Sequence, residues 1–196
     1  MRKSFCSLIS FLLFSLLACG AASAHWYVAP TGNDANNGSK RKPLKTIAAA
    51  LQRVNPGDTV FLREGSYREF VVPTRSGKPG KMITLKSYPG ETAKIDGSDL
   101  YIKGWGNALV QVNNIDYMQF ENLHICHAHD SENNTDPEGV YITGTSGNIT
   151  FRGCKVYDIK NDCPLVDAKG DWRSAHAILV LGTDDNTPIR NLLIEK

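Results

Sequence analysis

The sequence predicts an all-β solenoid, in which short parallel strands stack in successive coils around a continuous core. From residue 59 onward, short runs of β-branched and aromatic residues are broken by Gly, Asn, Asp or Pro. Only one helical pattern is visible after residue 24, and two kinds of strand recur, which favours a solenoid over a sandwich or barrel. The runs are residues 59–62, 70–72, 82–85, 109–112, 117–120, 140–143, 148–151, 178–181 and 192–194.

The recurring strands suggest how the coils align. One type occurs three times, and each copy ends in a turn residue: 108–114, 138–144 and 176–182. A second type occurs at 118–125 and 149–156, and residues 189–195 begin another copy. One coil cannot bury its inward-facing Val, Ile and Phe side chains alone. Stacked coils share a core, and their strands pair in parallel about 4.8 Å apart.

The segment that precedes the coils is predicted to close one end of this core. Residues 25–58 contain a short strand at 26–29, a polar loop, and an amphipathic helix over 45–54 with Thr46 as its N-cap. Such a helix can cover the open apolar end of the first coil. Residues 59–196 are then the rungs of the solenoid.

The first 24 residues are typical of a secretory signal peptide. Two basic residues precede an apolar segment, residues 8–17, which is too short to span a bilayer comfortably, and Ala22-Ser23-Ala24 is a small-residue cleavage site. As an alternative, Leu16-Leu17-Ala18-Cys19 resembles a loose lipobox that would leave a lipid-anchored Cys19. The chain is therefore expected to be secreted or extracellular, with a periplasmic or lipid-anchored location as alternatives.

Charge and cysteine content limit the partners. The formal net charge is +2, and acidic and basic residues are interspersed. No basic stripe suggests nucleic acid, no later apolar run suggests a membrane span, and we expect a monomer. Beyond the leader the chain has Cys126, Cys154 and Cys163, which permit one disulfide or remain as buried thiols. The strand-like ending at Lys196 predicts the N-terminal part of a longer solenoid, with a complete short solenoid as the alternative.

Four segments near the N-terminus carry a family resemblance. They are Trp26–Asp34 (WYVAPTGND), Pro43–Ile47 (PLKTI), Pro56–Val60 (PGDTV) and Arg63–Glu69 (REGSYRE). In this order they resemble the opening of secreted right-handed parallel β-helix proteins of the pectate-lyase type. The full prediction is therefore an all-β right-handed parallel β-helix with one N-terminal capping helix. We interpret the last segment as structural, with Tyr67 packed inward and Glu64 or Glu69 paired with a nearby Arg.

The resemblance also implies a chemistry. Lyases of this type cleave uronic-acid polymers by β-elimination, in which a base, often Lys or Arg, removes the proton at C5. Ca²⁺ or cationic side chains neutralise the adjacent carboxylate. Lys160 is a candidate base by residue type, although no family motif surrounds it, and the expected partner is an acidic polysaccharide.

Several candidate site residues follow from their positions. The segment from His127 to Glu138 is rich in oxygen ligands that suit Ca²⁺, although it can also be a solvated acidic loop. If the coils align as above, Glu138 and His176 lie at the same place on consecutive coils. They can then share a proton and bind a charged sugar. Alternatively, they are a pair at the edge of the sheet that has no catalytic role. The candidate metal ligands are Asp130, Asp136 and Asp184, although Asp184 also fits an ordinary Asx turn.

An inserted loop, residues 161–174, supplies further candidates. A Trp beside basic residues can stack on a sugar ring while the cations hold its carboxylate, so Trp172 and Arg173 are predicted to bind substrate. Three functions fit the sequence. The first is a polysaccharide lyase with Lys160, Glu138 and His176 in catalytic roles. The others are a non-catalytic glycan-binding or structural module, and a glycoside hydrolase using Glu138 with Asp130 or Asp184.

Overall fold

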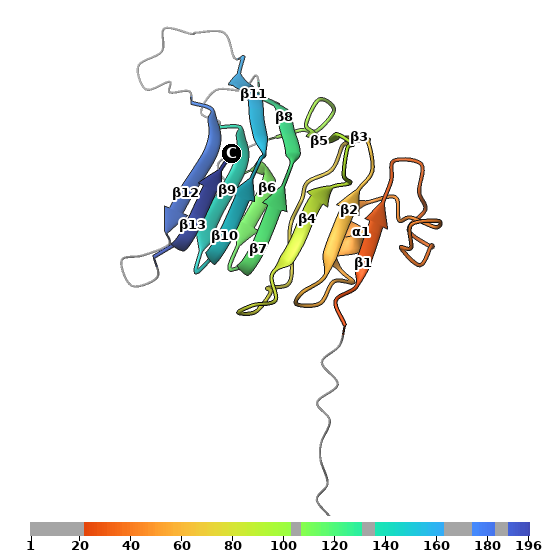
Figure 1. Cartoon of the computed structure of the whole chain (residues 1–196). Coiled ribbons are helices and arrows are strands. Elements are labelled where there is room, and N and C mark those ends of the chain that lie inside the picture. Colours follow the sequence, from red (N-terminus) through yellow and green to blue (C-terminus); the bar gives the residue numbers. More distant parts are fainter. Residues whose placement is uncertain (1–21, 103–106, 131–135, 163–173, 183–187) are drawn as a thin grey trace, which may run out of the picture.

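The computed structural model describes residues 22–102, 107–130, 136–162, 174–182 and 188–196, and these form a right-handed parallel β-helix (Figure 1). The six-stranded sheet contains β1 (His25–Val28), β2 (Thr59–Leu62), β4 (Ile83–Ser87), β7 (Asp116–Glu121), β10 (Gly147–Arg152) and β13 (Arg190–Glu195). The four-stranded sheet contains β3 (Gly65–Tyr67), β5 (Ala93–Asp96), β8 (Leu123–Asp130) and β11 (Lys155–Asn161). The three-stranded sheet contains β6 (Ala108–Asn113), β9 (Glu138–Gly144) and β12 (His176–Gly182). The predicted fold class is confirmed.

The predicted alignment of the coils is also confirmed. β9 pairs with β6 on one side and with β12 on the other, so that Ala108, Glu138 and His176 occupy equivalent positions on three coils. Because all pairings between named strands are parallel, a position on one coil recurs directly over its equivalent on the next.

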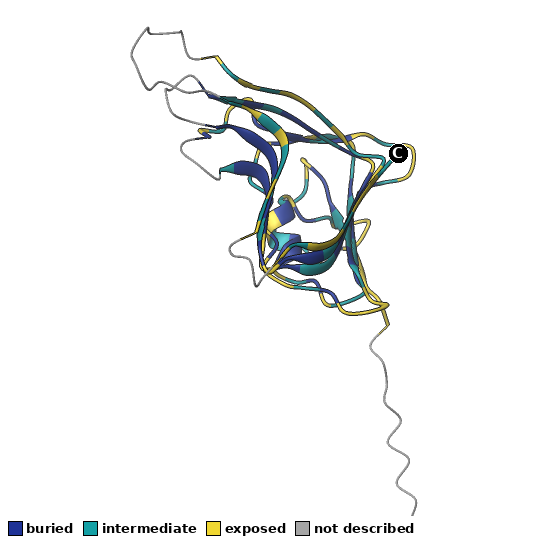
Figure 2. Ribbon diagram, turned by 90° about the vertical axis from the view of Figure 1, so that its left-hand side faces the viewer, coloured by how far each residue is buried: buried dark blue, intermediate teal, exposed yellow. Residues whose placement is uncertain are grey.

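The core is built from columns of inward side chains, and its buried residues are the dark blue segments of the ribbon in Figure 2. In one column Leu85 of β4 pairs with Phe120 of β7, which pairs with Phe151 of β10. The two phenyl rings stack with their centroids 4.6 Å apart, and all three side chains are almost completely buried. The column continues to Ile194 of β13, which is 57% exposed.

The structure corrects the prediction of the second recurring strand. Residues 118–125 do not form one strand, because the chain bends at Asn122, with φ of 53°, and passes from β7 into β8 on a different sheet. Gly153 makes the equivalent bend with φ of 61°, between β10 and β11. A Cβ added at Gly153 would lie 2.3 Å from Asn122 Oδ1, and the positive φ also favours glycine at this corner.

Three further differences concern the early coils. β3 and β5 were not predicted, because they are short and lie beside turn residues. Residues 70–72, predicted as a strand, contribute only an isolated bridge between Val71 and Val110. Residues 127–130, predicted as part of a loop, are the end of β8.

The capping helix is α1 (Ile47–Leu51), which is shorter than predicted. Thr46 is its N-cap, as expected, and Thr46 Oγ1 accepts a hydrogen bond from the Ala49 amide at 3.1 Å. Among the described residues no Arg pairs with Glu69; its carboxylate accepts hydrogen bonds from the Ile47 and Ala48 amides at 2.9 and 3.0 Å. In the view along the solenoid the helix lies inside the outline of the coils, where it covers the core (Figure 2). No helix within the described residues has the length and apolar character needed to cross a bilayer.

The partner of Arg63 is Glu91, which lies just before β5. The guanidinium binds the carboxylate in a forked contact, with Nε 2.8 Å from Oε2 and Nη2 2.7 Å from Oε1. These hydrogen bonds from Arg63 hold the pKa of the Glu91 carboxyl below its ordinary value. The contact ties β2 to the coil that follows it.

Replacing Glu91 with glutamine tests this contact and its pH dependence. Because the pKa of Glu91 is lower in the folded state, its stabilisation is present above the unfolded value, about 4.3, and is lost as pH falls through the folded value. We expect Glu91→Gln to lower the free energy of unfolding by about 1 kcal/mol at neutral pH. Urea denaturation at pH 7 and pH 3 measures this. An equal difference between variant and wild type at both pH values contradicts a role for the carboxylate charge.

Candidate functional site

The candidate site lies where β9 and β12 begin, beside the ends of β8 and β11. Asp136, Glu138 and His176 each offer one ligand atom, and these atoms lie within 4.8 Å of one another. Glu138 is completely buried and Asp136 is 3% exposed. The cluster therefore combines two buried carboxylates with an imidazole.

The parallel pairing of β9 and β12 brings the cluster together. It sets His176 directly beside Glu138, and the His176 amide donates a hydrogen bond to the Pro137 carbonyl at 3.1 Å. Gly139 permits this close approach, because a Cβ there would lie 2.7 Å from the Ala177 carbonyl oxygen. Ser174 donates a hydrogen bond to Asp136 Oδ1.

The burial of these groups indicates a site that attracts positive charge or a polar ligand. Buried carboxylates are costly unless they are paired, hydrogen-bonded or bound to a metal ion. The Nδ1 atom of His176 is also buried, and it has no hydrogen-bond partner among the described residues. A buried ring nitrogen of this kind can accept or donate a proton when a ligand enters.

The donor set only partly fits Ca²⁺. The carboxylate oxygens of Asp136 and Glu138 are ligands that Ca²⁺ takes, whereas the nitrogen of His176 suits softer ions. Asp130 ends β8 and is 7% exposed, but it is not one of the three grouped residues. Asp184 lies outside the described residues.

The remaining predicted residues are placed as follows. Lys160 is in β11, where its ammonium lies 3.8 Å from Asp158 and 3.5 Å from Asp162, so its ion pairs join it to these acids rather than to Glu138. Trp172 and Arg173 lie outside the described residues. Cys126 and Cys154 are free thiols, and Cys163 is not described.

The described surface also has a groove away from the carboxylate cluster. A groove of about 760 Å³ runs over the outer face of the six-stranded sheet, and its lining includes Lys81, Met82, Tyr117, Asn148 and Thr150. Sequence reasoning did not single out these residues, because their outward positions carry no motif. We place the candidate chemistry at the carboxylate cluster, since the groove lining contains no acidic side chain.

Sequence reasoning also missed a second cluster, formed by Asp96, Cys126 and His127. Asp96 was not proposed as a site residue, and Cys126 was expected only as a disulfide partner or a buried thiol. The pairing of β5 with β8 brings them together, and this pairing has no local signal in the sequence.

The coils, their pairing and the capped end define a right-handed parallel β-helix protein. Residues 26–185 match the family model described as the Pel9A-like, right-handed β-helix region, and the chain belongs to this family. It is 31% identical over 144 residues to the uncharacterized protein YwoF of Bacillus subtilis, covering 74% of this chain and 31% of YwoF. Several further relatives are pectate lyases.

Two solved structures resemble the fold. The crystal structure of pectate lyase Pel9A superposes with a TM-score of 0.54 at 26% identity, covering 69% of this chain and 34% of that one. The GH136 lacto-N-biosidase from Eubacterium ramulus has a TM-score of 0.56 at 17% identity, covering 88% and 34%, and this likeness concerns the fold alone. The chain spans about a third of the length of the curated relatives that it matches first.

Proposed function

We propose that this chain belongs to a secreted polysaccharide lyase that cleaves a uronic-acid polymer by β-elimination. The observation that carries the proposal is the Asp136–Glu138–His176 cluster, in which Glu138 and His176 occupy equivalent positions of adjacent coils. The scaffold is that of the Pel9A-like family, which includes a pectate lyase of known structure. The expected substrate is an acidic polysaccharide of the pectate kind, and the protein is proposed to act as a monomer.

The proposed elimination gives different roles to His176 and Lys160. Elimination moves the C5 proton to a base while the C4–O bond breaks and a C4–C5 double bond forms. His176 is the described group best suited to accept this proton, because its Nδ1 is buried and lacks a hydrogen-bond partner among the described residues. Lys160 lies beside Asp158 and Asp162, and its proposed role is to bind the sugar carboxylate.

The carboxylates are proposed to hold a cation. Asp136 and Glu138 supply oxygen ligands, and Asp130 and Asp184 remain proposed as further ones. When bound, Ca²⁺ neutralises the substrate carboxylate and so stabilises the charge that develops on loss of the C5 proton. Trp172 and Arg173 remain proposed as contacts to the sugar. Export follows from the leader pattern of residues 1–24, with a lipid-anchored form as the alternative.

A direct assay tests this function. The protein is incubated with polygalacturonate, with Ca²⁺ or with a chelator, and the ultraviolet absorbance of the unsaturated product is followed. We expect product with Ca²⁺ and little with the chelator. New reducing ends without the unsaturated product would indicate hydrolysis instead.

A second candidate function is glycan binding without cleavage. The groove beside Tyr117 favours it, because an aromatic ring next to amide and hydroxyl groups is a common surface for sugars. Retention of the protein on an immobilised polyuronate, without any product, would support this function and contradict the lyase. A Tyr117→Ala variant should then lose retention.

A further inference from the structure

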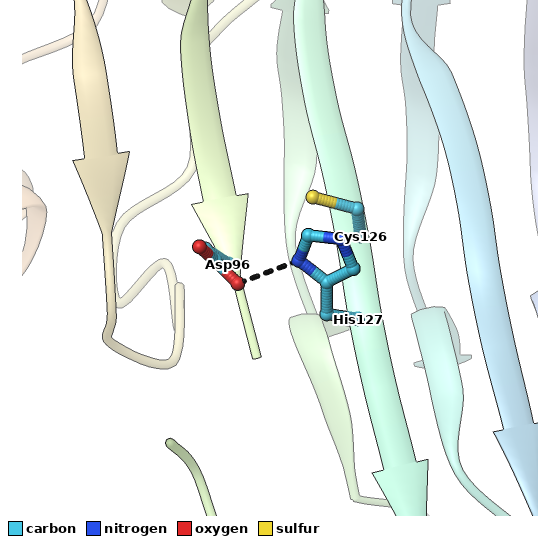
Figure 3. A group of neighbouring side chains, drawn as sticks. All are labelled: Asp96, Cys126 and His127. Atoms are coloured by element: carbon cyan, nitrogen blue, oxygen red, sulfur yellow. Dashed lines mark hydrogen bonds and ion pairs between the residues drawn. The ribbon is translucent and has the colours of Figure 1, made fainter. Parts of the chain in front are cut away.

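Asp96 of β5 lies together with Cys126 and His127 of β8, on two neighbouring strands of the four-stranded sheet (Figure 3). One ligand atom from each lies within 4.8 Å of those of the other two. His127 Nδ1 is 2.9 Å from Asp96 Oδ1. Carboxylate, thiol and imidazole are together the donor types that bind zinc in proteins. We propose that these three residues form a binding site for Zn²⁺ or a similar transition-metal ion, separate from the candidate lyase site.

The backbone explains how adjacent residues of one strand serve the same site. β5 and β8 pair Asp96 with Cys126. His127 then adopts a left-handed conformation, with φ of 59°, which a non-glycine residue seldom does. Asp158 on the next coil is in the same conformation, with φ of 54°. The same left-handed bend recurs at Tyr117, Asn148 and Asn191 in the six-stranded sheet, so it is a repeated feature of the coils that here turns the His127 side chain toward Asp96.

The distance between the imidazole and the carboxylate requires only a small adjustment, and the Cys126 sulfur lies within 4.8 Å of both ligand atoms. Zinc binds nitrogen at about 2.0–2.1 Å and oxygen at about 2.0–2.2 Å, so tetrahedral ligands of these types lie roughly 3.3 Å apart. The present separation of 2.9 Å between His127 Nδ1 and Asp96 Oδ1 must therefore open by a few tenths of an ångström. The Cys126 sulfur supplies the third ligand, and the fourth position is left for water or the Ser98 hydroxyl, which lies 3.2 Å from His127 Nδ1.

Neighbouring groups orient the proposed ligands. Ser98 donates a hydrogen bond from its hydroxyl to Asp96 Oδ1 at 2.6 Å. Burial of Asp96 opposes ionisation, but hydrogen bonds from Ser98 and His127 outweigh it and hold the pKa of the carboxyl well below its ordinary value. With Nδ1 on the metal, Nε2 of His127 carries its proton toward Asp158 Oδ2, which is 3.7 Å away. A carboxylate behind a metal-bound histidine is the usual supporting arrangement.

The thiol is kept protonated until a metal arrives. Cys126 is completely buried, and burial raises the pKa of its thiol. A hydrogen bond to this thiol raises the pKa of Tyr157 to about 12, so the tyrosine remains a neutral neighbour. Zinc binds the thiolate, so binding at Cys126 releases one proton. The side chain of His127 is 34% exposed, so a metal ion can reach the proposed site from solvent on this side.

Cobalt binding to the full chain tests the proposal. Co²⁺ replaces Zn²⁺ in tetrahedral sites, and a bound thiolate gives an intense near-ultraviolet charge-transfer band. We expect one equivalent of Co²⁺ to produce this band, excess Zn²⁺ to abolish it, and Cys126→Ala to eliminate it. Cys154→Ala and Cys163→Ala are the matched controls and should retain it. No band in the wild-type protein, or an undiminished band in Cys126→Ala, overturns the site and leaves an ion pair between Asp96 and His127.

A second measurement guards against a folding defect in the cysteine variant. A ligand that binds only the folded state raises Tm as its concentration rises above Kd. Zn²⁺ should raise the Tm of the wild type, and the rise should be smaller in Asp96→Asn and in His127→Ala. His124→Ala is the control, since His124 lies on the same strand but outside the cluster. An equal rise in all four proteins would place the zinc elsewhere and contradict the proposal.

Discussion

Replacing Glu138 with glutamine is expected to reduce lyase activity by at least about 100-fold, the usual cost of removing one electrostatic group from a catalytic site. The two side chains have nearly the same shape, so the substitution removes charge without emptying space. Glu138 is completely buried, with a carboxylate oxygen within 4.8 Å of ligand atoms of Asp136 and His176, and its carboxylate is proposed to hold the cation and to orient the imidazole. The rate of formation of the unsaturated product, measured over a range of Ca²⁺ concentrations, gives the loss.

The matched control for this variant is Glu64→Gln. Glu64 also carries a carboxylate but lies on the exposed surface before β3, away from the cluster. It should keep wild-type activity. Circular dichroism should show the same β content in both variants. Wild-type activity in Glu138→Gln would remove the cluster from the mechanism, even if the protein proved to be a lyase.

Replacing Phe120 with alanine is expected to lower the free energy of unfolding by about 3–5 kcal/mol, the usual range for a buried phenylalanine. Its side chain is completely buried, and its ring stacks on Phe151 of the next coil. Removing it leaves a void in a column of side chains that joins three coils, and strand pairing limits how far these coils can collapse. Since whole domains are stable by only about 5–15 kcal/mol, much of the stability should be lost. Equilibrium denaturation in urea measures the change.

Phe61→Ala provides the comparison. Phe61 lies on the outer face of β2, where its ring stacks on Tyr27 and remains partly accessible to solvent. We expect a loss of about 1 kcal/mol, because less area leaves the protein interior. Equal losses for the two phenylalanines would show that the interior column does not carry the stability we assign to it.

Parts of the fold were predictable because the same pattern repeats along the chain. The runs that begin at Ala108, Glu138 and His176 share an alternation and a turn, and parallel stacking converts this similarity directly into register. The corners were harder to predict. Asn122 interrupts what the sequence presents as one strand by taking a left-handed conformation, and no change in composition marks the step from one sheet to another.

Strand alignment also explains why one of the two clusters was predicted from the sequence and the other was not. Glu138 and His176 were predicted as neighbours because their strands align, and Asp136 is only two residues from Glu138. The cluster around Asp96 was missed because β5 has only four residues and its partner was assigned to the wrong strand. An ionisable residue is recognised as part of a site only when the facing strand is known.

The contacts of Glu69 have a consequence for the order in which the protein assembles. A helix of five residues is too short to persist alone, and two of its first amides are bound by this carboxylate, which lies two strands further along the chain. A ribosome builds the chain from its amino end, so the capping helix cannot form its hydrogen bonds to Glu69 until residue 69 has emerged. The earliest-made segment is therefore expected to wait for later ones, and a nascent chain that stops short of Glu69 should expose Leu51 to proteases and chaperones.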